Sequence, residues 1–330
     1  MKVLFATYPM AFHTPGGGEI QLLAYEKHLP QHGVRVTLFD LWKPLFLEHD
    51  LVHFFSCVGG SVHLCHFVKQ LGLPLVVSSS LWVTEETKHL YPCDEIRHQF
   101  LLADRVITNS EMEGETLART LDLPREKFTK VLNGVDDLFF DPVPPDRFRD
   151  MFNVTGPFVL NVGNIEPRKN QLALIRAMKQ MPELQLVLIG QARDPAYAQA
   201  CREEAAGGQV KFLGPIAHTD PILRSAYAAC EVFCLPSTLE TPGLAALEAY
   251  AVGAPIAITE VGSTREYFGH ASNVEFLDPA SVPTIAEAIR TARNNKDRAP
   301  ARSLDNARNL SWRNITGNLA NAYSTLLSGK

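Results

Sequence analysis

Short runs of consecutive apolar residues alternate along the chain with longer segments in which apolar and polar positions follow a helical period. Uninterrupted Val, Ile and Leu runs between such segments are typical of parallel strands covered by helices on both faces. A helical stretch over residues 19–31, ended by Gly33, follows the first run. In the first half of the chain, strands are predicted over residues 3–8, 34–39, 51–55, 75–79 and 105–108.

A Pro-rich, polar segment over residues 141–157 interrupts this alternation and is the best candidate for a linker between domains. We therefore expect an α/β protein with two doubly wound, Rossmann-like domains, residues 1–150 and 151–330, and a ligand cleft between the carboxyl ends of their sheets. The last helix, over about residues 312–327, is expected to pack back on the first domain. Beyond the linker, strands are predicted over residues 158–162, 184–189, 210–213, 232–235, 256–259 and 274–277, and helices over 171–181, 194–206 and 222–229.

Composition and charge narrow the classes of function. With 46% apolar and 20% charged residues and a net charge of −5, the chain has an ordinary globular composition, and no nucleic-acid partner is expected. Residues 1–150 carry 14 Lys and Arg against 20 Asp and Glu, which weighs against a broad electrostatic membrane patch there. No apolar run reaches the roughly 18 residues of a membrane-spanning helix. The six cysteines form no paired framework and are expected to be reduced, which favours a cytoplasmic location.

The most informative segment, residues 236–249, contains two glutamates. A buried strand leads into a polar loop with Glu240. A helix predicted from about Gly243 places Glu248 about a turn and a half into that helix. Helix N-termini offer unpaired N–H groups and a positive dipole end to anions. Two carboxylates beside one anion site suit a sugar phosphate or a nucleotide sugar, because N–H groups bind phosphate and carboxylates accept hydrogen bonds from hydroxyls.

Two cations precede that segment on the same predicted sheet edge. Arg168 and Lys169 lie between a predicted strand and a predicted helix, where they can neutralise a diphosphate. A metal-bridged diphosphate is not expected, because the chain contains no Asp-x-Asp motif. His63 and His66 share a helical face but supply too few ligands for a metal site, so no metal is expected there either.

A glycine run follows the first predicted strand and opens the first predicted helix. Gly16, Gly17 and Gly18 either let the backbone approach a phosphate or substrate closely, or form a flexible turn. The dinucleotide fingerprint G-x-G-x-x-G is incomplete, because Gln21 stands at its third glycine. Asp40 does stand where a ribose ligand would, so a nicotinamide hypothesis is tempting but incomplete.

Taken together, these features resemble the retaining glycosyltransferases of family 4, which have the two-domain GT-B fold, over nearly the whole chain. The segment from Glu240 to Glu248 matches the E-x7-E element of that family and is the most specific marker. The other markers are weak singly and strong together, because they occur in the right order and spacing. They are Gly16-Gly17-Gly18-Glu19, Thr108-Asn109-Ser110, Asn133-Gly134-Val135-Asp136, Glu166-Pro167-Arg168-Lys169-Asn170 and Phe212-Leu213-Gly214.

The resemblance implies a metal-independent, cofactor-free hexosyltransferase that moves a sugar from a nucleoside-diphosphate sugar to an acceptor hydroxyl with retention of anomeric configuration. The implied catalytic residues are Glu240, at the donor sugar, and Lys169, at the diphosphate. Glu248 would accept hydrogen bonds from the ribose, and the segment near Gly214 would line the base. The implied substrate-binding residues are Gly17, Gly18, Asn164, Arg168, Gly214, Gly243, Leu244, Ala245 and Glu248.

The first domain is implied to hold the acceptor, which the sequence leaves open among a sugar, a lipid-linked sugar and a small molecule. Peripheral contact with the inner face of a membrane is compatible with this. The chain departs from the family pattern at three places. Asn164 replaces a second diphosphate-binding Arg, residues 78–82 lack the usual acceptor-side His, and Pro242 replaces an aromatic residue.

Two alternatives stay open at the level of sequence. One is a GT-B relative with other nucleotide-sugar chemistry, such as an epimerase or a transferase that makes a non-glycosidic bond. A phosphorylase is disfavoured, because it usually needs pyridoxal phosphate and a much longer chain. The other is a non-catalytic module that binds a nucleotide or sugar, although the intact Glu240, Lys169 and Glu248 argue against it.

Overall fold

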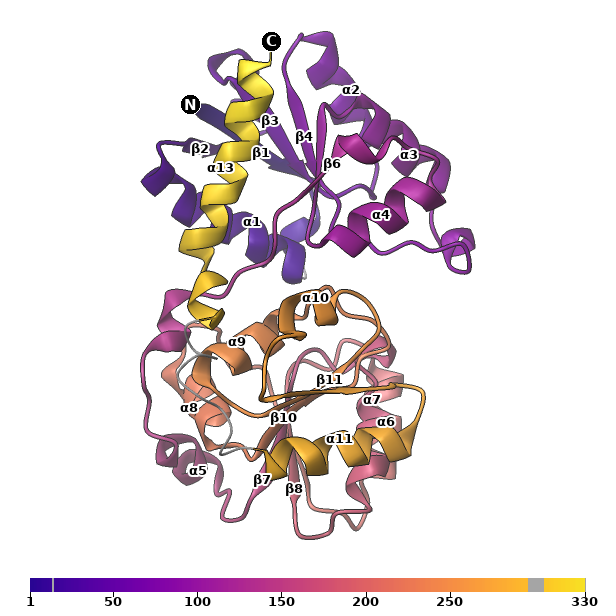
Figure 1. The fold of residues 1–330 in the computed structure, drawn as a ribbon, viewed down its shortest axis with the longest axis vertical. Helices are drawn as coiled ribbons and strands as arrows, with labels where there is room; N and C mark the ends of the chain where they lie inside the picture. The colour runs from indigo at the N-terminus through magenta and orange to yellow at the C-terminus, as the bar shows by residue number, and fades with distance from the viewer. Residues whose placement is uncertain (14, 296–305, 330) are drawn as a thin grey trace. The chain divides into compact units, whose positions relative to one another are not determined.

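The computed structural model describes residues 1–13, 15–295 and 306–329, which fold into two compact units (Figure 1). The first unit comprises Met1–Gly134 and Leu310–Lys330, and the second comprises Val135–Asn309. Each unit contains one six-stranded sheet whose neighbouring strands are all parallel. The predicted fold class, two doubly wound α/β units, is confirmed.

The boundary between the units lies at residues 134–135 and not at residues 150–151, where the Pro-rich segment predicted it. That segment is packed on the second unit by Ser225, a buried residue of a helix in this unit. The Ser225 hydroxyl donates a hydrogen bond to the carbonyl of Pro144 at 2.7 Å and accepts one from the N–H of Phe148 at 2.9 Å. Proline carbonyls remain good acceptors, so Pro-rich composition alone does not make a segment a free linker.

The sheet of the first unit has the order β2-β1-β3-β4-β5-β6. Its last strand escaped the pattern analysis, because only one of its three residues is buried. The strands are β1 (Lys2–Thr7), β2 (Arg35–Leu38), β3 (Leu51–Phe55), β4 (Leu75–Ser78), β5 (Arg105–Thr108) and β6 (Phe128–Lys130). The helices are α1 (Gly17–His28), α2 (Val62–Gln70), α3 (Cys93–Leu102), α4 (Glu111–Thr120) and α13 (Trp312–Ser328).

Helices cover both faces of this sheet. On one face, Phe54 and Val77 of the strands form a buried cluster with Val68, Phe100 and Leu117, which come from α2, α3 and α4. These helices lie together on one side of the unit in Figure 1. Because side chains alternate along a strand, the neighbours of Phe54 point to the opposite face.

The opposite face is covered by α1 and by the C-terminal helix α13, which lie side by side (Figure 1). The ring of Tyr25 on α1 contacts the rings of Phe55 and Trp312, with centroids 6.1 and 5.6 Å apart. The imidazole Nδ1 of His53 on β3 lies 2.5 Å from the hydroxyl oxygen of Tyr323. Trp312 and Tyr323 both belong to α13, so the end of the chain is part of the hydrophobic core of the first unit.

The sheet of the second unit has the order β12-β11-β10-β7-β8-β9. Its strands are β7 (Phe158–Val162), β8 (Gln185–Ile189), β9 (Val210–Leu213), β10 (Val232–Leu235), β11 (Ile256–Thr259) and β12 (Val274–Leu277). Its helices are α5 (Asp146–Phe152), α6 (Gln171–Met178), α7 (Pro195–Glu204), α8 (Pro221–Ala229), α9 (Leu244–Val252), α10 (Thr264–Phe268) and α11 (Val282–Asn294).

Two helical layers enclose this second sheet. Helices α6, α7 and α11 pack on one face, where Leu174, Cys201 and Ile289 join a buried cluster with strand residues such as Val159. On the other face, α5 and α8 pack together. The ring of Tyr227 on α8 lies 5.6 Å from that of Phe233 on β10. Both faces of the sheet are therefore buried, as the uninterrupted apolar runs predicted.

The strand order of the second unit reverses between β7 and β10, since the chain leaves β7 toward β8 on one side and later places β10 on the other. The ladder between these two strands is short and stops at Leu160 and Phe233. Beyond it, the side chain of Asn161 donates to the carbonyl of Cys234 at 2.8 Å in place of a backbone bond. Open α/β sheets bind ligands beyond the carboxyl ends of their strands at such a reversal.

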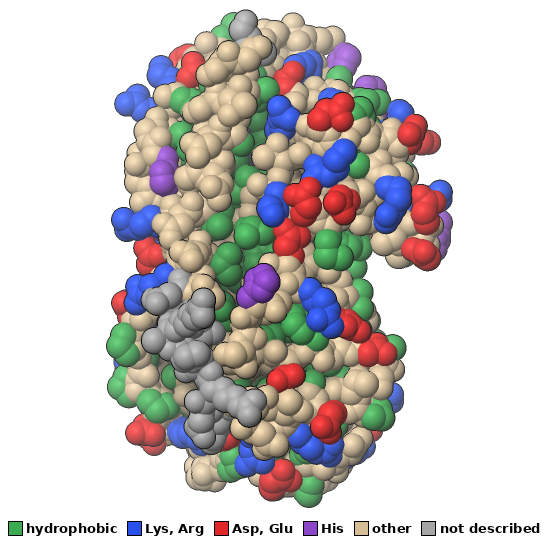
Figure 2. Space-filling model, viewed as in Figure 1, with side chains coloured by type: hydrophobic (Ala, Val, Ile, Leu, Met, Phe, Trp, Pro, Cys, Tyr) green, Lys and Arg blue, Asp and Glu red, His purple; other side chains and the backbone are tan. Residues whose placement is uncertain are grey.

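The described part of the chain has no helix that is long and apolar enough to cross a membrane. On the face drawn in Figure 2, basic and acidic side chains are interspersed over both units and do not gather into a patch of one sign.

Candidate functional site

The loop after β7 carries the two predicted cations into position. It begins at Gly163, whose φ of +152° is rarely adopted by other residues, and a Cβ there would lie 3.4 Å from the Lys169 side chain. A single 3-10 turn, Pro167–Lys169, follows and ends at Asn170 in the left-handed region, with φ of +57°. The turn places Arg168 and Lys169 just ahead of helix α6.

This loop is tied to the loop after β10. The side-chain amide of Asn170 donates to the carbonyls of Pro236 and Pro279, at 3.1 and 2.8 Å. The N–H of Thr238 donates to the carbonyl of Arg168 at 2.8 Å. The bonds from Asn170 join segments that follow three different strands, β7, β10 and β12, so the edge of the sheet beyond the reversal is held together by polar contacts.

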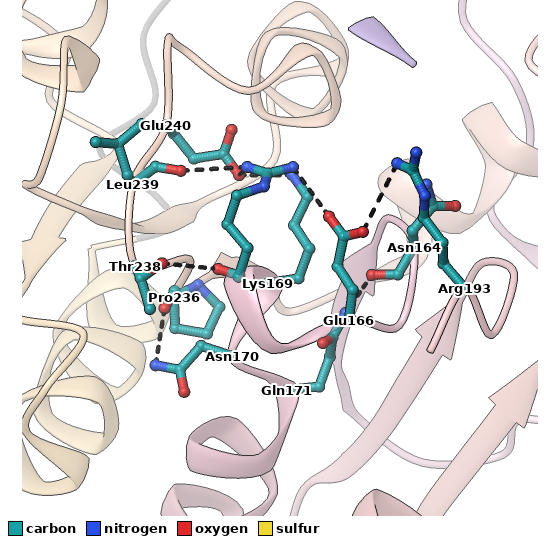
Figure 3. A network of polar contacts seen from close by, with 11 residues as sticks. Asn164, Glu166, Lys169, Asn170, Gln171, Arg193, Pro236, Thr238, Leu239 and Glu240 are labelled. Atoms are coloured by element: carbon teal, nitrogen blue, oxygen red, sulfur yellow. Dashed lines mark hydrogen bonds and ion pairs between the residues drawn. The ribbon is translucent and has the colours of Figure 1, made fainter. Parts of the chain in front are cut away.

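These hydrogen bonds between the two loops place Lys169 and Arg168 in contact with Glu240. The ammonium Nζ of Lys169 lies 2.5 Å from Glu240 Oε1, and one guanidinium nitrogen of Arg168 lies 3.5 Å from the same oxygen (Figure 3). Arg168 also donates to the carbonyl of Leu239 at 3.3 Å and pairs with Glu166 at 3.1 Å. The sequence placed these two cations and this carboxylate on one sheet edge, and the structure puts them in direct contact.

The glutamate is buried, which sets its ionisation. Only 4% of Glu240 is exposed. Burial is the largest single influence on its pKa and acts to raise it. The charges of Lys169 and Arg168, with hydrogen bonds from Lys169 and Ser237, together outweigh burial, and the pKa lies below its ordinary value. Glu240 is therefore an anion at neutral pH, and it neutralises the buried end of Lys169.

A third loop fixes the backbone of Glu240. Its N–H donates to the carbonyl of Val261 and its carbonyl accepts from the N–H of Ser263, at 3.1 and 3.0 Å. Gly262, between them, has φ of +100°, and a Cβ at this residue would lie 2.1 Å from the carbonyl oxygen of Glu240. Gly262 was not predicted from the sequence. The only signal for it is a glycine shortly after a predicted strand.

Helix α9 begins immediately beyond Glu240. Ala246 and Leu247 donate to the carbonyl of Gly243 at 3.0 and 3.3 Å, so the N–H groups of Leu244 and Ala245 lie ahead of the intrahelical ladder. Gly243 has φ of +86°, and a Cβ there would lie 3.1 Å from Glu240 Oε2. The N-terminus of α9 and the Glu240 carboxylate therefore lie close together.

Replacing Gly243 by Ala is expected to lower the free energy of unfolding by about 1–3 kcal/mol, because a Cβ there would also lie 2.7 Å from the Leu235 side chain in a strained backbone conformation. Gly214→Ala is the matched control, since a Cβ at Gly214 meets nothing within 4 Å. Its effect should stay within about 0.5 kcal/mol. Urea unfolding of both variants measures the difference, and equal stabilities would contradict the geometry at Gly243.

The second glutamate of the segment is held from α8 and from the loop after β9. Glu248, the fifth residue of α9, is 7% exposed. Its Oε2 accepts a hydrogen bond from the hydroxyl of Tyr227 at 2.6 Å, and its Oε1 lies 3.2 Å from Nδ1 of His218. Burial and the charge of Glu248 raise the pKa of Tyr227 well above its usual range, so this phenol stays protonated and donates.

The contacts of Glu248 identify two residues that were not predicted from the sequence. His218 lies only four positions after Gly214, which was predicted to line the base, so a place for His218 near this site could have been predicted from the sequence. Tyr227 carried no signal, because an aromatic residue on the apolar face of a helix is normally part of the core. The ring of Phe139 lies 5.0 Å from the imidazole of His218 and limits where that ring can move.

The charged groups of this cluster are buried. Both glutamates are almost fully enclosed, and the Lys169 side chain is only 13% exposed. Charged groups tolerate such burial because each has a partner of opposite charge or a hydrogen-bond donor at close range. Substitution at these positions therefore affects folding stability as well as ligand binding.

The remaining predicted residues are more dispersed. The carbonyl of Asn164 accepts from the side chain of Gln171 at 2.9 Å, close to the Glu166–Arg193 pair (Figure 3). Gly214 directly follows β9. Gly17 and Gly18 belong to the first unit, where they are the first two residues of α1. Among the described residues, no group of three or more His, Cys, Asp or Glu side chains is arranged to hold a metal ion.

Comparison with known proteins decides the family. The family model described as glycosyl transferases group 1 matches residues 143–310, just over half of the chain. The chain belongs to this family. The matched region of this group 1 glycosyl transferase contains Arg168, Lys169, Glu240 and Glu248, so the whole cluster described above lies inside it.

The relatives of this group 1 glycosyl transferase act on different molecules. It is 28% identical, over 68% of its own length and 54% of the relative, to a D-inositol 3-phosphate glycosyltransferase of Mycolicibacterium smegmatis. It is 32% identical, over 51% of its length and 46% of the relative, to the O-antigen chain mannosyltransferase B of Escherichia coli. The chain thus spans about half the length of the curated relatives it matches.

Solved structures agree on the GT-B fold. The Anabaena protein HepE, crystallised in complex with UDP-glucose, superposes with a TM-score of 0.79 at 21% identity, over 98% of this chain and all of that one. A sucrose-phosphate synthase of Thermosynechococcus elongatus superposes with a TM-score of 0.82 at 19% identity, over the whole of both chains. At these identities the likeness concerns the fold alone.

Proposed function

We propose that this protein transfers a hexose-type sugar from a nucleoside-diphosphate sugar to an acceptor hydroxyl, with retention of anomeric configuration. The observation that carries the proposal is the convergence of Lys169 and Arg168 on the buried Glu240, beside the start of helix α9. The cluster lies beyond the β7–β10 reversal, where sheets of this type bind nucleotides.

The diphosphate of the donor is assigned to the cations and the helix start. The Lys169 ammonium has three donors, one of which points at Glu240, and the half-exposed Arg168 guanidinium has five in a planar fork. The N–H groups of Leu244 and Ala245 add two donors and the positive end of a helix dipole. A diphosphate binds such a set of donors without displacing the Lys169–Glu240 pair.

The ribose is assigned to Glu248 and the base to the segment near Gly214. Tyr227 and His218 hold the Glu248 carboxylate in one orientation, and each carboxylate oxygen retains a second lone pair for a ribose hydroxyl. The link from Glu248 to His218 places Glu248 next to the loop that begins at Gly214. A nucleoside with its sugar on α9 therefore has its base near that loop.

The chemistry proposed for these groups is positioning and charge stabilisation. As the bond between the anomeric carbon and the phosphate oxygen breaks, negative charge grows on the leaving diphosphate, toward Lys169 and Arg168. Glu240 holds Lys169 in place and accepts hydrogen bonds from the donor sugar. The acceptor oxygen bonds to the anomeric carbon on the face that the phosphate leaves, and its proton passes to the departing phosphate oxygen.

UDP-sugars are the first donors to test, because a structural relative, Anabaena HepE, was crystallised with UDP-glucose. Curated relatives that act on an inositol phosphate and on an O-antigen chain support transfer to a hydroxyl and leave the acceptor class open. The acceptor is assigned to the first unit, in which Gly17 and Gly18 open helix α1. Neither a cofactor nor a metal has a role in this proposal.

Initial transfer rates are expected to be unchanged in an excess of EDTA, because Arg168 and Lys169 supply the positive charge that a divalent ion supplies in metal-dependent enzymes. The measurement is nucleoside-diphosphate release before and after chelation, with a chelated sample re-supplied with Mg²⁺ or Mn²⁺ as the control. A loss of rate that either ion restores would mean that the diphosphate is held by a metal.

The proposed function itself is tested by product analysis. The protein is incubated with UDP-, GDP-, ADP- and TDP-sugars and a panel of hydroxyl acceptors, and nucleotide release is followed together with the NMR coupling constant of the new anomeric proton. A glycoside with the anomeric configuration of the donor is expected. An altered donor sugar without transfer would indicate an epimerase, and tight binding without turnover would indicate a binding module.

A further inference from the structure

A cavity of about 720 Å³ opens in the first unit, with all of its walls inside that unit. Its size is within the range of pockets that bury small organic ligands. Its lining comes mainly from the residues that follow three neighbouring strands: Tyr8 after β1, Phe39–Trp42 after β2, and Gly59 and Gly60 after β3. None of the residues assigned to the nucleotide sugar takes part.

The topology of the sheet explains the position of this cavity. The chain goes from β1 to β2 on one side and then to β3 on the other, so the strand order reverses between β1 and β3 (Figure 1). The cavity lies beyond the carboxyl ends of these strands, where doubly wound sheets bind their ligands. Gly59 and Gly60, both with φ of +78°, let the chain after β3 turn away and leave the space open.

The walls of the cavity are largely apolar, because hydrogen bonds within the protein occupy several of the polar groups that line it; the exposed His63 is a further polar residue of the lining. The hydroxyl of Thr7 donates to the carbonyl of Phe55 at 2.7 Å, and that of Ser61 donates to the Gln99 side chain at 2.6 Å. One carboxylate oxygen of Asp40 accepts from the N–H of Trp42 at 2.9 Å. The lining that remains is dominated by aromatic and aliphatic side chains such as Phe5, Phe12, Leu22, Leu38, Phe54 and Leu64.

The rim of the cavity is apolar too. Leu41 is 69% exposed and Trp42 is 95% exposed, and both line the cavity. An exposed apolar rim continuous with an apolar interior marks a site that meets an apolar ligand or surface. A compact sugar or a small ring would be enclosed by the interior and would leave this rim in water.

We propose that this cavity holds the hydrocarbon chain of a lipid acceptor whose hydroxyl-bearing head group receives the sugar. This inference rests on the proposed function, because a glycosyltransferase needs an acceptor. The apolar interior and rim of the cavity indicate that the acceptor is a lipid. The chain of the lipid lies against the walls and passes over Leu41 and Trp42. The indole of Trp42, apolar with one N–H donor, suits the boundary between a hydrocarbon chain and a polar head.

The test uses a series of n-alkyl β-D-glucosides with four to eight carbons, titrated into the full-length protein below their micelle-forming concentrations. Each added methylene that enters the cavity is expected to strengthen binding roughly fourfold, the factor that corresponds to burial of one CH₂ group. A phenyl glucoside serves as the aromatic comparison. The octyl glucoside is expected to bind more tightly than the phenyl glucoside.

Leu41→Glu is expected to weaken binding of the octyl glucoside at least about tenfold, because it places a charge at the rim of the cavity. Leu90→Glu is the matched control, since Leu90 is 67% exposed, belongs to the same unit and does not line the cavity. It should bind octyl glucoside as the unmodified protein does. Circular dichroism and thermal unfolding of both variants establish that they are folded.

Three outcomes would overturn the inference: affinity that does not depend on alkyl length, tighter binding of the phenyl glucoside than of the octyl one, or equal effects of the two substitutions. Titration of nucleoside diphosphates on the same samples separates this inference from the proposed function. Nucleotide binding without alkyl binding overturns only the lipid acceptor. Alkyl binding without any nucleotide binding overturns the transferase and leaves a lipid-binding cavity.

Discussion

Replacing Glu240 by Gln is expected to lower kcat by roughly 10²- to 10³-fold, the scale of removing one preorganised electrostatic group from an active site. The carboxylate holds the Lys169 ammonium at 2.5 Å and is assigned to the donor sugar. A neutral amide keeps the shape and one hydrogen bond but no longer fixes the cation where charge develops. Affinity for the nucleoside diphosphate should stay within a few-fold of the unmodified protein, because the sugar is not part of that ligand.

Glu248→Gln is the matched comparison, since it makes the same chemical change on the same segment. Glu248 is assigned to the ribose, which is bound alike in the ground state and the transition state. This variant should therefore mainly raise the donor KM and weaken nucleotide binding, with kcat little changed. Steady-state kinetics and calorimetric titration on both variants separate the roles. Normal turnover of Glu240→Gln, or the same behaviour in both variants, would refute the division.

Lys169→Ala is expected to weaken nucleoside-diphosphate binding at least about tenfold, through loss of a charge-assisted contact to phosphate. It should also lower the free energy of unfolding by about 3 kcal/mol, because it leaves the buried Glu240 without its closest cation. The double variant Lys169→Ala with Glu240→Gln should recover much of the stability and none of the binding. Urea unfolding and calorimetry measure the two effects separately.

The same pair predicts how stability depends on pH. The pKa of Glu240 is lower in the folded protein than the value of about 4.3 expected in the unfolded chain. Its contribution to stability is therefore fully present above that unfolded value and is lost as the pH falls through the lower folded value. Unfolding between pH 3 and 6 should show this loss in the unmodified protein and not in Glu240→Gln. Identical pH profiles would mean that the pair does not stabilise the fold.

The sequence predicted the fold because both sheets are buried on both faces. Strands such as β7 and β10 consist almost wholly of apolar residues, and helices separate them, so few other arrangements bury them. The exceptions have local causes. Strand β6 has one buried residue, and the boundary between the units was misplaced because the bonds from Ser225 to the Pro-rich segment cannot be seen in composition.

The candidate site was predictable where residues lie in loops directly after strands. Arg168, Lys169 and Glu240 follow β7 and β10, and strands that flank an order reversal bring their loops together. Tyr227 and Gly262 were not predictable, because their roles depend on the packing of α8 and on a backbone contact between two loops. The apolar cavity likewise escaped notice, since its walls come from residues far apart in the chain and individually typical of core positions.

We expect a nucleoside diphosphate to bind on the second unit between Arg168–Lys169 and Glu248. Calorimetric titration of UDP, GDP, ADP and TDP into the unmodified protein and into Lys169→Ala and Glu248→Gln measures this binding. At least one nucleotide is predicted to bind with a stoichiometry of one, and both substitutions are predicted to weaken that binding about tenfold or more. Absence of binding by all four nucleotides, or equal affinity in the three proteins, would contradict the claim.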